Sequence, residues 1–312
     1  MNRTGSRARE GVVYGLAAYG LWGAFPLYFV LLERSSPVEI VLHRVLWSLL
    51  VCLIAVGVLR RGRELSVALR SVRTLVPLTV AALVLALNWG IYIYAVTSGQ
   101  VVQASLGYFV NPLVTVLLGV LVLRERLRPA QWVAVSIGAA AVGVLTFAYG
   151  RLPWIALTLA FSFGTYGLIK NRVGASHSAL TSLTTETLVL APLAAGVLVW
   201  IERTGRGHFA ENPPWQGLLL ASAGVATVIP LLLFAAAARR VPLSSMGLMQ
   251  YLTPVLQLLC GVLLLGESVP PSRWVGFGLV WLALAVLTVD SLRSAQQRSR
   301  RAAQSDAEPV AA

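Results

Sequence analysis

The sequence predicts an all-α integral membrane protein of ten transmembrane helices, arranged as two inverted five-helix repeats. Three observations support this class: the composition, a repeat between the two halves of the chain, and the placement of the basic residues. Apolar residues make up 57% of the 312 residues, only 12% are charged, and the mean hydropathy is +0.76. Because soluble domains carry about 25% charged residues, a chain of this composition belongs in a lipid bilayer.

Ten apolar segments are long enough to cross the hydrocarbon core, which takes about 20 residues of helix. They are expected at 11–32, 37–59, 74–97, 101–123, 129–149, 152–171, 178–201, 216–238, 243–265 and 272–291. Residues 1–10 form a short N-terminus, and the polar residues 292–312 are expected to be a disordered tail.

The second half of the chain repeats the first at a constant offset of 142 residues. Identical residues at this offset include Pro112 and Pro254, Gly119 and Gly261, Glu125 and Glu267, and Trp132 and Trp274. The two repeats, 11–149 and 152–291, hold five spans each. Because five is odd, the second repeat enters the membrane from the opposite side, and such inverted repeats commonly place a substrate site between them and work by alternating access.

The net charge of +13 is explained by the positions of the basic residues. With the N-terminus in the cytoplasm, 19 Lys and Arg residues lie on that side, five lie on the other, and Arg44 lies inside a span. This asymmetry predicts a multi-pass protein of the plasma or inner membrane, with both termini cytoplasmic. The basic side faces membrane lipid, and no nucleic-acid partner is expected.

Paired prolines mark two candidate helix breaks. Pro112 and Pro254 lie near the middle of the fourth and ninth spans, and each removes a backbone hydrogen bond to the carbonyl four residues earlier. Irregular backbone at membrane depth usually faces a cavity. Polar neighbours make these segments candidates for the substrate path: Gln103, Ser105, Tyr108, Asn111, Gln250 and Tyr251. The alternative is a pair of simple kinks whose carbonyls are bonded by neighbouring helices.

Three ionisable residues that lie well inside the predicted spans are functional candidates. His43 and Arg44 are roughly 9 Å in from one end of the second span, and Glu186, which matches Arg44 at the offset of 142, is roughly 12 Å in from the end of the seventh. Such residues usually face the bundle interior and serve substrate or ion pathways. A substrate counter-charge and proton coupling are the functional interpretations, while snorkelling by Arg44 and local hydrogen bonding are the structural ones.

Polar and aromatic residues of the third and sixth spans complete the candidate set: Asn88, Trp89, Tyr92 and Tyr166. An aromatic cavity favours amphipathic organic solutes over bare ions, although most aromatic residues in membrane proteins serve packing or the interface.

No phosphate-binding loop, nucleophile elbow or zinc motif is present. We therefore expect no enzymatic activity, no cofactor and no metal site. An intramembrane enzyme is the alternative, and it would require His43 and Ser105 to meet as base and nucleophile.

Several motifs resemble the drug/metabolite transporter superfamily, with two EamA-type domains, and more closely its RarD branch, whose members carry the label chloramphenicol-sensitive. They are AYGLWG at 18–23, HRVLWS at 43–48, ASLGYFVNP at 104–112, LAFS at 159–162, Glu186-Thr187-Leu188 and Gln250-Tyr251. The resemblance implies a ten-span secondary permease with a substrate path between its halves. It carries no agreed coupling residues that could be transferred to this chain.

The leading hypothesis is therefore a permease that exports a small organic solute, a drug or a metabolite, driven by its gradient or by protons. One alternative is an importer or exchanger of amino acids or other metabolites with the same fold. The other, from a different class, is a non-transporting membrane scaffold or sensor. Substrate, direction and coupling ion stay open, as does the choice between a monomer and a homodimer.

Overall fold

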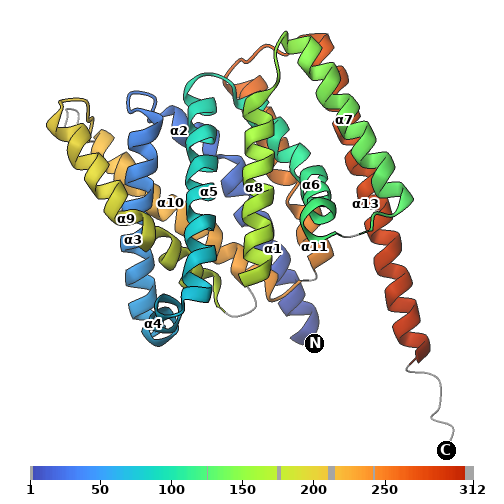
Figure 1. The fold of residues 1–312 in the computed structure, drawn as a ribbon, viewed down its shortest axis with the longest axis horizontal. Coiled ribbons are helices and arrows are strands. Elements are labelled where there is room, and N and C mark those ends of the chain that lie inside the picture. Colours follow the sequence, from blue (N-terminus) through green and yellow to red (C-terminus); the bar gives the residue numbers. More distant parts are fainter. Residues whose placement is uncertain (1–2, 125, 174–176, 210–214, 242, 306–312) are drawn as a thin grey trace, which may run out of the picture. The chain divides into compact units, whose positions relative to one another are not determined.

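The computed structural model describes residues 3–124, 126–173, 177–209, 215–241 and 243–305, and every regular element in these ranges is a helix. Nine described segments are long and apolar enough to cross a membrane. The sixth predicted span corresponds to a shorter apolar stretch, Trp154–Lys170, of helix α8 (Trp154–Val173). The protein is thus an all-helical membrane protein, as predicted (Figure 1).

The chain divides into two compact units. Unit 1 comprises Met1–Asn111 and Trp154–Val269, and unit 2 comprises Pro112–Pro153 and Pro270–Ala312. Each unit therefore draws residues from both sequence repeats. The helices of unit 1 are α1 (Arg3–Gly23), α2 (Phe25–Val30), α3 (Pro37–Val58), α4 (Gly62–Arg70), α5 (Val72–Thr97), the first half of α6 (Val101–Leu123), α8, α9 (Ala179–Arg203), α10 (Trp215–Ala238), α11 (Leu243–Met249), α12 (Leu252–Leu259) and the π-helix η1 (Cys260–Leu264).

Local sequence signals set several helix ends in unit 1. The Ser36 hydroxyl accepts a hydrogen bond from the Glu39 N–H at 3.2 Å, and Pro37 follows at the first helical position, so α3 begins here. The Ser178 hydroxyl caps α9 in the same way through the Thr181 N–H. Both caps lie at the predicted span starts, which explains why those boundaries were foreseeable.

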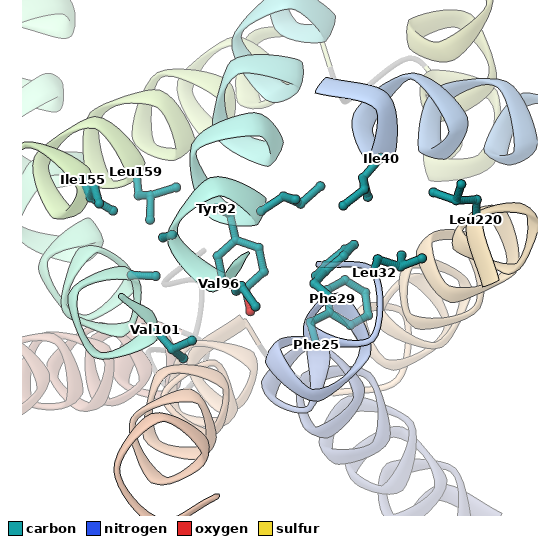
Figure 2. Close-up of a cluster of buried hydrophobic side chains, with 13 residues drawn as sticks. Phe25, Phe29, Leu32, Ile40, Tyr92, Val96, Val101, Ile155, Leu159 and Leu220 are labelled. Carbon is teal, nitrogen blue, oxygen red and sulfur yellow. The ribbon is translucent and has the colours of Figure 1, made fainter. Parts of the chain in front are cut away.

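Helix α3 packs against both α9 and α10, α5 packs against α8, and α1 packs against α10 and α12. A buried apolar cluster draws residues from α2, α3, α5, α6, α8 and α10 and includes Phe25, Phe29, Tyr92 and Ile93. Figure 2 shows Phe25 and Phe29 projecting from α2, and Tyr92 from α5, into this buried region. Tyr92 of this cluster, and Tyr108 packed against it, also belong to the candidate site described below.

Unit 2 contains the second half of α6, α7 (Pro129–Tyr149) and α13 (Pro271–Ser305). Helices α7 and α13 lie side by side, and an ion pair of 2.7 Å joins Arg128 to Asp290 (Figure 1). Helix α13 continues beyond the predicted span end at 291. The expectation of disorder is therefore wrong for residues 292–305, which are helical, while residues 306–312 lie outside the described part of the chain.

The two proline-containing spans differ. Helix α6 runs through Pro112 without interruption, so the predicted break is not found there. The ninth span is interrupted at Gln250 and Tyr251, just before Pro254, and continues as α12 and η1. The Gln250 carbonyl, freed by Pro254, accepts the Thr253 N–H at 3.3 Å. A local turn thus supplies a donor for the freed carbonyl.

Glu267 caps helix α6 from a distant part of the sequence. Its Oε1 accepts the Val101 N–H at 2.6 Å and its Oε2 accepts the Val102 N–H at 2.9 Å. A carboxylate at this position also interacts favourably with the positive end of the helix. The sequence marked Glu267 only as a repeated residue, and the structure gives it this role.

We expect Glu267→Ala to lower the free energy of unfolding by about 1.5–3 kcal/mol, because the N–H groups of Val101 and Val102 at the start of α6 lose a charged acceptor. Glu267→Gln keeps one acceptor oxygen and should lose less. The measurement is the thermal unfolding midpoint of the purified protein in detergent. The control is Glu33→Ala, an exposed glutamate; equal midpoints for the Glu267→Ala and Glu33→Ala variants would contradict the capping role.

A second carboxylate joins α4 to the start of α9. Glu64 Oε1 accepts the Ser178 N–H at 2.6 Å, and Arg61 lies 3.3 Å from Oε2. Burial alone would raise the pKa of Glu64, but hydrogen bonds from Ser178 and Thr181 and the charge of Arg61 outweigh it and lower the pKa below its ordinary value. The contact therefore depends on the ionised carboxyl.

Because the folded-state pKa is lowered, Glu64 stabilises the fold above its unfolded pKa and loses this contribution as the pH falls through the folded value. We expect Glu64→Gln to lower the unfolding midpoint at neutral pH, and the difference from wild type to shrink below about pH 4.5, the ordinary value. Unfolding midpoints across this pH range test it. A difference that stays constant with pH would show that the ionised form is not involved.

Candidate functional site

The predicted site residues of unit 1 fall into three groups around helices α3, α5, α8 and α9. The first surrounds Arg44 and is called the aromatic site here. The second is an ion pair at Glu186, and the third is a His–Glu cluster at the start of α3.

The aromatic site is built around the guanidinium of Arg44, which is 4% exposed. The Cζ atom lies 3.9 Å from the Trp89 ring centroid, 5.4 Å from that of Phe25 and 5.6 Å from that of Phe29. Its Nε donates to Thr227 Oγ1 at 2.8 Å. Within the described residues no carboxylate lies within ion-pair distance of Arg44. A cation–π setting thus replaces the usual counter-charge.

Tyrosine and amide side chains extend this site. The Tyr92 ring packs edge-on against Tyr108 at 5.7 Å, and Gln257 Nε2 donates to the Tyr92 hydroxyl at 3.1 Å. The Tyr108 hydroxyl donates to Asn88 Oδ1 at 3.4 Å, and Asn88 Nδ2 donates to Ser162 Oγ at 2.9 Å. The structure therefore brings together the predicted residues Arg44, Asn88, Trp89, Tyr92 and Tyr108, and adds Gln257.

The remaining polar residues of α6 behave differently. Ser105 donates to the Val102 carbonyl of its own helix, and Asn111 donates to the Ala160 carbonyl of α8 at 3.0 Å. Gln103 is 3% exposed, and both its amide nitrogen and its amide oxygen lack a hydrogen-bond partner. Buried unpartnered amides are costly, so Gln103 stays a candidate for contact with water or solute.

Glu186 pairs with Lys170, not with Arg44. The Lys170 Nζ lies 2.6 Å from Glu186 Oε1, and the Tyr166 hydroxyl donates to Oε2 at 3.3 Å. Arg44 and Glu186 occupy equivalent positions of the two repeats and carry opposite charges. In the structure they have different partners: Arg44 contacts Trp89 and Thr227, and Glu186 contacts Lys170 and Tyr166. In the sequence Lys170 is one of the 19 basic residues assigned to the cytoplasmic side, at the end of the sixth predicted span, and nothing there marked it as a partner of Glu186.

His43 lies in the third group, near the start of α3. Its Nδ1 accepts the Trp47 indole N–H at 3.3 Å, while its Nε2 is buried without a partner. Ligand-type atoms of Glu39, His43 and Glu202 lie within 4.8 Å of one another. Both Glu39 oxygens already accept from His208, its N–H at 2.7 Å and its Nδ1 at 3.1 Å. Both Glu39 oxygens are therefore engaged, whereas His43 Nε2 and Glu202 Oε1 are buried without a hydrogen-bond partner among the described residues.

The enzyme alternative finds no support in these contacts, because His43 and Ser105 each hydrogen-bond to a different partner. Gln250 and Tyr251 lie at the break of the ninth span, half-buried. An open groove of about 380 Å³ between α5 and α8 is lined mainly by apolar side chains such as Val84, Leu87 and Phe161. Its lining shares only Ser162, the hydrogen-bond partner of Asn88, with the aromatic site, and it suits a lipid tail better than a polar solute.

The comparisons with known proteins agree with this fold. The chain belongs to the EamA-like transporter family, whose model matches residues 9–147 and 152–289. It is therefore a membrane transporter by family, consistent with a protein that is not an enzyme. A solved structure described as "Crystal structure of protein" is 21% identical, covers 89% of this chain and 97% of its own, and has a TM-score of 0.59, which supports the fold alone.

Within the family the chain belongs to the RarD branch. Protein RarD of Streptomyces exfoliatus is 50% identical over 94% of this chain and 92% of its own length. An uncharacterized transporter of Pseudomonas aeruginosa is 43% identical over 92% and 95%. The chloramphenicol-sensitive protein RarD of the same species is 33% identical over 94% and 98%.

Proposed function

We propose that this transporter exports a small organic solute and that the solute binds at the aromatic site. The supporting observation is the group of polar side chains buried among apolar helices: Arg44, Asn88 and Tyr92 are 4%, 1% and 3% exposed. Buried polar groups at membrane depth are costly and typically mark a substrate or ion pathway. A packing role alone gives no reason for an unpaired arginine there.

The proposed mechanism is alternating access between two inverted five-helix repeats, 11–149 and 152–291, with both termini in the cytoplasm. The constant offset of 142 residues and the odd number of spans per repeat support the inversion. The excess of basic residues on one side supports the orientation. Arg44, Asn88 and Tyr92 of the aromatic site are buried in the described conformation.

Proton coupling is assigned in this proposal to the Glu186 pair. Glu186 is 1% exposed, and Lys170 and Tyr166 contact its carboxylate, so its charge state is linked to the positions of α8 and α9. A change of protonation would weaken the contact to Lys170 and alter the packing of these two helices.

The test is accumulation of a radiolabelled panel, chloramphenicol and amino acids included, in sensitive bacteria that express wild type, Glu186→Gln or an empty vector, with and without an uncoupler. We expect wild type to lower accumulation of at least one compound, and the uncoupler and the Glu186→Gln change to abolish the effect. Glu33→Gln, at an exposed glutamate, is the matched control and should behave as wild type.

Raised accumulation would favour the importer or exchanger, and an effect insensitive to both the uncoupler and Glu186→Gln would remove the proton-coupling assignment. No change for any compound of a broad panel, with the protein present in the membrane, would favour the scaffold or sensor.

A further inference from the structure

The Arg44 guanidinium has one hydrogen bond where it could make five. Its Nε–H donates to Thr227 Oγ1, and the Thr227 hydroxyl in turn donates to the Ala223 carbonyl at 2.8 Å, which fixes the hydroxyl as an acceptor. Among the described residues no acceptor is hydrogen-bonded to either Nη atom. Arg44 is therefore held in one orientation with four donors unused.

The two Nη atoms border free space. The fully enclosed side-chain atoms without a partner include His43 Nε2 and both polar atoms of Gln103, and they do not include an Arg44 nitrogen. The Trp89 ring lies against the guanidinium at 3.9 Å. Ring stacking shields the charge from lipid and offsets only part of the cost of burying it, while the donor edge stays open in the guanidinium plane.

The Tyr92 hydroxyl is a second donor of the aromatic site. The Tyr92 hydroxyl accepts from Gln257 Nε2, and its own hydrogen has no acceptor among the described residues. The Arg44 charge interacts electrostatically with the hydroxyls of Tyr92 and Tyr108. The site thus offers a guanidinium fork, a phenol O–H and aromatic walls, and no acidic side chain.

We propose that Arg44 binds the carboxylate of a singly charged aromatic or apolar organic acid, and that this acid is the class of solute carried. This inference rests on the proposed function. A guanidinium fork matches the two oxygens of a carboxylate in its plane. A phosphate would bring a second negative charge, and Lys170, a partly buried cation of unit 1, is already paired with Glu186. The aromatic rings contact the rest of the solute.

The test uses matched ligands on the purified full-length protein in a chloride-free, carboxylate-free buffer. The probes are 3-phenylpropionate, its neutral amide and phenylalanine, and the readout is the ligand-induced shift of the unfolding midpoint over a concentration series. We expect the acid to raise the midpoint and the amide to be at least tenfold weaker. Phenylalanine should also bind more weakly than the acid, because the described residues of the site include no carboxylate to pair with its ammonium group.

Arg44→Met and Arg44→Lys separate charge from geometry. Arg44→Met should fold with an equal or higher midpoint without ligand, because it removes an unpaired buried charge, and should lose the response to the acid. Arg44→Lys should retain a response at least fivefold weaker, since a lysine lacks the fork. Thr227→Val should weaken the response to the acid less than Arg44→Met does. Arg206→Met removes a more exposed arginine that lies over Trp200 and should respond as wild type.

Equal responses to the acid and its amide, an Arg44→Met variant that responds as wild type, or chloride that acts as strongly as the acid would each overturn the inference. Uptake by proteoliposomes distinguishes a failure of the carboxylate site from a failure of the proposed transport function. Binding of the acid without flux would reject transport of this class and leave the carboxylate site in place. Flux of neutral compounds that is independent of Arg44 would reject the carboxylate site and leave transport in place.

Discussion

Replacing Lys170 with methionine is expected to lower the stability of the protein by about 3 kcal/mol. The substitution leaves the Glu186 carboxylate, which is 1% exposed, with only the 3.3 Å hydrogen bond from Tyr166. Removing one partner of a buried ion pair typically costs about 3–5 kcal/mol, and the low end applies because the Lys170 side chain is 24% exposed. Equilibrium unfolding of the purified protein in detergent measures the loss.

The two partners differ in burial, because the Lys170 side chain is 24% exposed and that of Glu186 only 1%. Variants of each partner therefore serve as controls. Glu186→Gln leaves Lys170, whose ammonium can still reach water, so its loss should be smaller. The double variant Lys170→Met with Glu186→Leu should recover most of the stability, because no buried charge remains. Arg61→Met breaks the pair with Glu64, in which both side chains are about one-third exposed, and should change stability by less than about 1 kcal/mol. Equal losses for Lys170→Met and Arg61→Met would contradict the burial argument.

The positions of the helices were predictable because a bilayer imposes a simple rule on length and composition. The predicted span 129–149 coincides with α7, and α3 begins at the predicted residue, where Ser36 and Pro37 give a local start signal. The length of α13 was not predictable in this way. Its apolar pattern ends near 291, but residues 292–305 are mostly Ala, Arg, Gln and Ser, and straight-chain residues and alanine continue a helix without any apolar face.

The different behaviour of the two prolines depends on tertiary contacts that the sequence repeat does not contain. Near Pro254, Thr253 Oγ1 donates to the Tyr19 carbonyl at 2.9 Å, and Gln257 donates to the Trp22 carbonyl. These bonds to α1 accompany the break. Near Pro112, Asn111 donates to a carbonyl of α8 instead, and α6 stays helical. The same residue type at equivalent positions thus has different consequences.

For the candidate site, burial was predictable and partners were not. Arg44, Asn88, Tyr92 and Glu186 were singled out because polar groups inside an apolar span must face protein or water. Their contacts come from other helices: Thr227 lies 183 residues from Arg44 in the chain. Lys170 was indistinguishable from the other basic residues of the cytoplasmic side, since its role depends on its contact with Glu186 of α9.

Replacing Gly224 with valine is expected to have an effect of similar size, because α10 approaches the backbone of α3 at this residue. A Cβ atom on Gly224 would lie 2.5 Å from the Trp47 carbonyl oxygen and 2.8 Å from the Ser48 nitrogen. Main-chain atoms of a packed helix cannot rotate away, so the two helices must separate. Overpacking of this kind costs about 1–3 kcal/mol and occasionally more, with valine worse than alanine. The unfolding midpoint measures it.

Gly196→Ala in α9 is the matched control, because no atom lies within 4 Å of its added Cβ. Alanine is the better helix former by about 1 kcal/mol, so this variant should be neutral or slightly stabilised. Gly224 also lies one turn before Thr227, whose hydroxyl holds Arg44 at 2.8 Å. Separating α10 from α3 should therefore weaken carboxylate binding as well as stability. A Gly224→Ala variant that lost stability and kept full binding would show that Thr227 does not set the orientation of Arg44.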